Sequence, residues 1–158
     1  MSIYSWSDIL TSIDRYKIYT LRCEPSALWN CIAEVLSASI NVLNLGKEVA
    51  GFIKDLPEHT YLDIEVMEFI PKLLEKHSSQ INNAGNHMVA IYNLGLLLEP
   101  MLKLNTVQLL SEFSKSKALI IIWEHDNDGK GNLSWATQKN SFSLDFSMIP
   151  IKQLQYAI

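Results

Sequence analysis

Residues Cys23 to Asn30 (CEPSALWN) lie between a predicted first strand and a predicted helix. Backbone N–H groups at a helix start attract anions, so this turn is where an α/β protein would bind a nucleotide's phosphates. Such a turn needs glycines that let the backbone wrap phosphate, a lysine for the terminal phosphates, and a Ser or Thr for magnesium. The segment has no glycine and no lysine, Ser26 is its only hydroxyl, and Glu24 adds negative charge. The turn is therefore not predicted to bind phosphate in the usual way.

A second place for nucleotide chemistry is the end of the apolar run Met88 to Tyr92, which is typical of a buried strand. In nucleotide hydrolases a strand of this kind ends in an acidic residue that holds magnesium or polarises water. Here it ends in Tyr92 and Asn93. Both halves of the hydrolytic machinery are missing, so we predict no catalytic residue and no cofactor.

The polar segment Asp126 to Asn132 (DNDGKGN) has two readings. It matches the first, third and sixth positions of a calcium-binding loop. Lys130 stands at the fifth position, which needs an oxygen ligand, and Thr137 stands at the twelfth, where a Glu should supply a bidentate ligand. Because a hairpin turn has this same composition, we predict a turn and no metal site.

Histidine and cysteine residues give no further site. The four histidines are scattered, without a partner at metal-ligand spacing: His59, His77, His87 and His125. Cys23 precedes a helix start, a position that can lower a thiol pKa, although a small residue at a strand end explains it as well. With Cys31 as the only other cysteine, we expect no disulfide framework and a reducing compartment.

The elements around these residues alternate between apolar runs and amphipathic patterns. Strands are expected at 16–22, 39–43, 88–92 and 118–123, and helices near 28–36, 45–56, 63–74 and 106–113, with a surface loop at 78–86. Asp63 and Thr106 are expected as N-caps, and Pro71 should kink the third helix. Short apolar strands separated by helices predict a parallel sheet covered on both faces.

After residue 125 the pattern changes. Leu133 to Ala136 and Ser141 to Phe146 predict an antiparallel hairpin added to the edge of the sheet. We therefore predict one α/β domain over 1–158, with an N-terminal extension at 1–15, a hairpin at 126–146 and a C-terminal tail at 147–158.

Composition excludes several classes of protein. The 158 residues are 48% hydrophobic and 19% charged, which is ordinary globular usage. The net charge of −4 disfavours direct nucleic-acid binding. The longest apolar run, Ala118 to Trp123, is too short to span a membrane, and Met1 to Leu10 has no basic start typical of a secretory signal. We expect a soluble, cytoplasmic protein.

The segment from Val89 to Trp123 resembles the BrxF family, the small P-loop proteins of type 3 BREX phage-defence systems. The shared pattern is a strand, an acidic turn, Glu-Pro, a Leu-Leu helix, Ser-Lys and a strand that ends in Trp. The turn GKGNLSWA, Gly129 to Ala136, is similar to the family's hairpin. The resemblance covers roughly Ile18 to Phe146 and implies a P-loop-like fold in an anti-phage setting.

The resemblance also places the family's functional residues. Its phosphate-binding lysine falls on Trp29, its magnesium hydroxyl on Asn30, and its acidic pair on Tyr92 and Gly95. Each is substituted, so positions 23 to 30 are a vestigial phosphate loop: Cys23, Glu24, Pro25, Ser26, Ala27, Leu28, Trp29 and Asn30. Trp29 would either fill the space of a lost nucleotide or anchor another protein.

The leading hypothesis is a non-catalytic interaction or scaffolding subunit, an accessory component of a prokaryotic anti-phage defence system that contacts larger protein partners. One alternative is an NTP-binding or NTP-hydrolysing enzyme or switch with non-standard contacts. Another is a nucleic-acid-binding module. The sequence leaves the partner's identity and the oligomeric state open.

Overall fold

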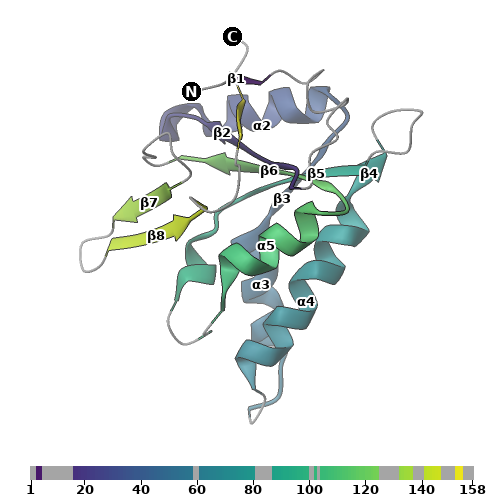
Figure 1. The fold of residues 1–158 in the computed structure, drawn as a ribbon. Coiled ribbons are helices and arrows are strands. Elements are labelled where there is room, and N and C mark those ends of the chain that lie inside the picture. The colour runs from purple at the N-terminus through teal and green to yellow at the C-terminus, as the bar shows by residue number, and fades with distance from the viewer. Residues whose placement is uncertain are drawn as a thin grey trace.

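The computed structural model describes residues 3–4, 16–58, 61–80, 87–99, 102, 104–124, 132–136, 141–146 and 152–154. These residues form the predicted α/β fold, a largely parallel sheet with helices on both faces (Figure 1). The strands of the main sheet are β1 (Ile3–Tyr4), β2 (Ile18–Arg22), β3 (Asn41–Asn44), β4 (Ser79–Gln80), β5 (His87–Tyr92), β6 (Ala118–Trp123) and β9 (Lys152–Leu154). The helices are η1 (Pro25–Ala27), α2 (Leu28–Ser37), α3 (Leu45–Lys54), α4 (Leu62–His77), η2 (Gly95–Leu98) and α5 (Thr106–Ser114).

The parallel strands lie side by side in the order β9, β2, β6, β5, β3, with β1 outside β9 and β4 antiparallel to β5. If these five strands are renumbered one to five along the chain (β2, β3, β5, β6, β9), their order across the sheet is five, one, four, three, two. Arg22 lies opposite Trp123, and Asn44 lies opposite Tyr92. The carboxyl ends of β2, β3, β5 and β6 therefore meet at one edge of the sheet, where ligands bind in open α/β folds.

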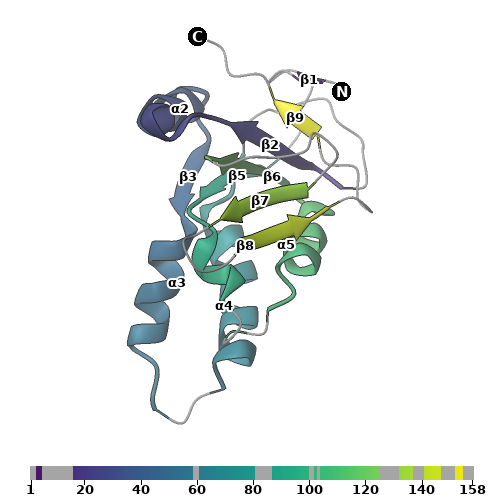
Figure 2. The same cartoon turned by 90° about the vertical axis from the view of Figure 1, so that its left-hand side faces the viewer.

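Side chains of each central strand point alternately to the two faces of the sheet. In β6, Leu119 and Ile121 belong to one hydrophobic cluster, and Ile120 and Ile122 belong to the other. This double burial explains why β5 and β6 are continuously apolar in the sequence. Among the described helices, α2 packs on one face, and α3, α4 and α5 pack on the other (Figures 1 and 2). We call these the α2 face and the α4/α5 face.

The hairpin is present, but its predicted position at the sheet edge is wrong. Strands β7 (Asn132–Ala136) and β8 (Ser141–Asp145) pair with each other in a separate two-stranded sheet. Leu133, Leu144 and Phe146 are buried in the cluster of the α4/α5 face. The reason is hydrophobic: these side chains gain more by packing over the main sheet than a strand at its edge would allow.

The sheet edge is instead occupied by the two ends of the chain. Strand β9 lies in the segment predicted as a C-terminal tail and pairs in parallel with β2, with Thr20 opposite Gln153. Strand β1 lies in the predicted N-terminal extension and pairs with β9. Both segments therefore contribute strands to the main sheet.

Helix starts differ from the predictions by one or two residues. Helix α4 begins at Leu62, so Asp63 lies within its first turn, and the N-cap is Tyr61, whose side chain makes no capping bond. Helix α5 is capped by Asn105, whose side chain accepts a hydrogen bond from the Gln108 N–H. The predicted cap Thr106 is buried and donates its hydroxyl to the Leu97 carbonyl at 3.2 Å.

Helix α4 continues through Pro71 to His77. Because proline has no N–H, the Met67 carbonyl lacks the helical donor that residue 71 would otherwise supply. Of the predicted surface loop 78–86, residues 81–86 lie outside the described part of the chain, and Ser79–Gln80 pairs with β5. Across the described residues, none of the helices combines the length and apolar character that crossing a membrane requires.

Candidate functional site

The turn after β2 is a single 3-10 turn that runs directly into α2. Pro25 has no N–H to offer. The Ala27 N–H bonds the Glu24 carbonyl at 2.9 Å, and the Leu28 N–H bonds the Pro25 carbonyl. A phosphate cradle needs several backbone N–H groups that point freely at the ligand. Three of the four positions from Pro25 to Leu28 cannot supply one.

The charges of this turn are paired with each other. Arg22, its only cation, donates from Nη1 to the Glu24 carboxylate at 2.8 Å. The Glu24 side chain is 68% exposed, so solvent screens the pair and its contribution to stability is small, at most about 1 kcal/mol. The pair matters more for ligand choice, because a phosphate would meet a carboxylate and a cation that is already bound.

Two thiols lie beneath the turn. Cys23 and Cys31 are free but buried in the α2-face cluster, and their side chains share a hydrogen bond. Burial raises the pKa of Cys23, against the lowering effect of the bond to Cys31. Burial, with a contribution from Cys23, raises the pKa of Cys31 to about 12. Both thiols stay protonated at neutral pH, which favours packing over reactivity for Cys23.

The structure brings only part of the vestigial site together. Cys23, Leu28 and Tyr92 all contact the α2-face cluster. Gly95 instead begins η2, whose Leu97 is buried on the α4/α5 face. Of the two positions that the resemblance gives for an acidic pair, Tyr92 packs on the α2 face, and Gly95 begins a turn that leads to the α4/α5 face.

Sequence reasoning missed a repeated tripeptide at the same edge. Both β3 and β5 lead into Asn-Leu-Gly, at residues 44–46 and 93–95. The Asn93 side chain donates to the Asn44 side chain at 2.8 Å, and Asn93 has a positive φ of 62°. Gly46 lies so close that an added Cβ would be 2.5 Å from the Asn93 carbonyl. The repeat is visible in the sequence, and its residues hold the ends of the neighbouring strands β3 and β5 together.

Helix α2, which follows the turn, presents large apolar side chains to solvent. Trp29 is 71% exposed and Leu36 is 53% exposed, with the exposed Ala33 between them. The spacing i, i+4, i+7 places the three on one side of α2, and we call them the α2 stripe. The exposure of Trp29 is compatible with the second reading of this residue, an exposed anchor for another protein.

The exposed side of α2 is uncharged, and the helix's one charged residue, Glu34, is half-buried. The exposed residues of α2 are Trp29, Asn30, Ala33, Leu36 and Ser37, none of which is charged. Helices α3, α4 and α5 each expose at least one Lys or Glu. Depletion of charge around an aromatic residue distinguishes the centre of a protein interface from ordinary surface.

Metal chemistry finds no support among the described residues, which contain no group of three or more His, Cys, Asp or Glu side chains able to hold an ion. The predicted hairpin turn at 126–131, His59 and His125 lie outside the described part of the chain. Comparisons with protein-family models, with curated proteins and with solved structures found no match.

Proposed function

We propose that this chain is a non-catalytic interaction or scaffolding subunit that binds a larger protein through the α2 stripe. The observation that carries the proposal is the turn after β2, where the Ala27 and Leu28 N–H groups and the Arg22 cation are internally bonded while Trp29 is 71% exposed. A surface built in this way offers little to a phosphate and much to an apolar protein surface.

The biological setting follows from the resemblance. The parallel strand order five, one, four, three, two, with helices on both faces, is compatible with the P-loop-like fold that the BrxF resemblance implies. We place the chain in the cytoplasm as an accessory component of a prokaryotic anti-phage defence system. Since a fold does not by itself imply a function, the partner must be identified directly.

Site-specific photocrosslinking in the native host tests this proposal. Benzoylphenylalanine replaces Trp29 in one strain and Lys54, an exposed residue of α3 on the other face, in a matched control. We expect one dominant protein adduct from position 29 and none of that mass from position 54. Equal adducts from both positions, or none from position 29, would contradict a specific α2 surface.

Co-expression then tests the defence setting. The tagged chain is produced with the products of its neighbouring genes, with a large ATPase, a methyltransferase and an alkaline-phosphatase-like protein as the partners that the BREX reading expects. The wild type should co-purify one of them, the Trp29→Ala variant should lose it, and Tyr61→Ala, which removes a 75% exposed aromatic residue elsewhere, should keep it.

A further inference from the structure

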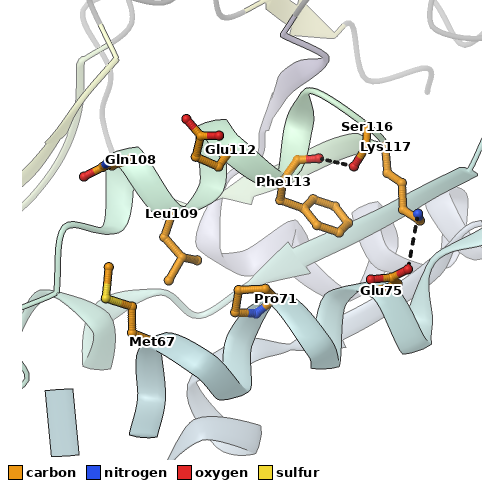
Figure 3. A pocket seen from close by; sticks show the side chains of 9 residues that line it. All are labelled: Met67, Pro71, Glu75, Gln108, Leu109, Glu112, Phe113, Ser116 and Lys117. Carbon is orange, nitrogen blue, oxygen red and sulfur yellow. Dashed lines mark hydrogen bonds and ion pairs between the residues drawn. The ribbon is translucent and has the colours of Figure 1, made fainter. Parts of the chain in front are cut away.

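A groove between α4 and α5 lies apart from the α2 stripe, on the opposite face of the sheet. Its volume is about 370 Å³, near the low end of the range of ligand pockets. Figure 3 shows Met67 and Pro71 of α4 facing Leu109 and Phe113 of α5 across it. Leu109 and Phe113 are at most 9% exposed and form an apolar floor.

The apolar surface continues beyond the groove along α4. Ile64 is 53% exposed and Met67 is 48% exposed, and with Pro71 they follow the spacing i, i+3, i+7. This strip is about 10 Å long at the helical rise per residue. A small molecule would fill the cavity and leave the strip in water, whereas an amphipathic helix would cover both with a row of anchors.

The rim of the groove carries charge on both walls, and its outermost charge is negative. Glu75 of α4 and Glu112 of α5 line the groove, with side chains 71% and 60% exposed. Their lysine partners, Lys117 at 3.7 Å and Lys115 at 2.8 Å, are only 21% and 31% exposed. A partner that approaches from solvent therefore meets the carboxylates first.

From this geometry we propose that the α4/α5 groove binds an amphipathic helix of a partner protein, with apolar anchors in the groove and Lys or Arg residues against the rim. The apolar anchors supply affinity, and the cations match Glu75 and Glu112. This surface and the α2 stripe lie on opposite faces, so the chain can hold two proteins at once, as a scaffold does.

Synthetic peptides test the proposal on the full chain. The first probe is a fluorescein-labelled 18-residue helix with Leu at i, i+3, i+4 and i+7 and Lys at the flanking positions. The second replaces each Lys with Glu, and the third scrambles the first. We expect the Lys helix to bind at least ten-fold more tightly than the other two, and its affinity to fall as salt is raised from 50 to 500 mM.

Two variants locate the binding. Glu112→Lys should weaken the Lys helix and strengthen the Glu helix, and this reversal cannot result from misfolding. Met67→Lys should weaken the Lys helix at least ten-fold, with an unchanged thermal midpoint. Trp29→Ala removes the α2 stripe and should leave peptide binding unchanged, so failure of this proposal is distinguishable from failure of the proposed function.

Three results would overturn the proposal: equal binding of the Lys and Glu helices, no saturable binding by the Lys helix, or a loss in Trp29→Ala as large as that in Met67→Lys. A fourth is binding of an apolar dye, weakened by Met67→Lys, that no peptide displaces. That outcome would assign the groove to a small molecule.

Discussion

The two faces of the sheet solve the problem of covering apolar strands in different ways. On the α2 face one described helix does the covering, and its fully exposed residues are uncharged and include Trp29 and Leu36. On the α4/α5 face three helices and the hairpin share the task, and their solvent sides are charged. The buried cores are alike in chemistry, so the difference lies in what each face offers to other molecules. Stability explains the cores, and our proposals assign the exposed apolar residues to binding.

The largest effect we expect is on binding at the α2 face. Trp29→Ala should weaken binding of the crosslinked partner by about 30-fold, or about 2 kcal/mol, because exposed tryptophans that become buried dominate interface energies. Titration calorimetry with the purified partner measures it. Tyr61→Ala, the matched loss of an exposed aromatic residue, should change affinity less than two-fold, and equal losses in both variants would erase the contrast between the faces.

The next effect concerns how α3 is held against the strand ends. Gly46→Ala should destabilise the protein by about 1–3 kcal/mol, because its Cβ would lie 2.5 Å from the Asn93 carbonyl. Gly51→Ala in the same helix is the control, since its Cβ would meet nothing within 4 Å. That change should stabilise by about 0.4–1 kcal/mol. Urea unfolding compares the two, and equal midpoints would contradict the close contact.

A pH dependence is expected from the thiols under α2. The pKa of Cys31 is raised from its ordinary 9.0 to about 12 in the folded chain. The unfolded chain therefore loses the proton first, and stability falls as pH rises from 9 toward 12, by at most about 1.4 kcal/mol per pH unit. In Cys31→Ala this part of the slope should be absent. Urea midpoints at pH 8, 9 and 10 test it, and parallel slopes for the two proteins would refute the assignment.

The smallest expected effects are on the free energy of unfolding when exposed apolar residues of α2 and α4 are replaced. Leu36→Lys on α2 and Met67→Lys on α4 should each change the free energy of unfolding by less than about 0.5 kcal/mol, because both side chains are already about half exposed. Thermal melts measure this. A loss above 1 kcal/mol in either variant would mean that the residue belongs to the fold and not to a binding surface.

Much of the fold was predictable because its signals are local. The apolar runs of β5 and β6 could be read directly, since strands buried on both faces leave no polar positions. The N-cap residues of the helices were harder to predict. Asn105 and Thr106 are adjacent polar residues, and only the tertiary contact of Thr106 with Leu97 decides which one caps α5.

The remainder depends on distant contacts. Strand β9 has only three residues, and its pairing with β2 joins residues far apart in the sequence, with Thr20 opposite Gln153. For the turn after β2, the sequence predicted which residues are lacking, because the absence of glycine and lysine from Cys23 to Asn30 can be read directly. The internal bonding of the turn and the exposure of Trp29 could not be predicted, since they depend on how η1 leads into α2.

The most direct test of the central claim is a titration of the ¹⁵N-labelled chain with Mg-ATP up to millimolar concentration, with the amides from Cys23 to Asn30 followed by NMR. Because Pro25 has no N–H, the Ala27 and Leu28 N–H groups are bonded within the turn, and Arg22 is paired with Glu24, we predict no saturable shift in these resonances. Saturable shifts with a micromolar dissociation constant would contradict the account and would show that this turn binds nucleotide.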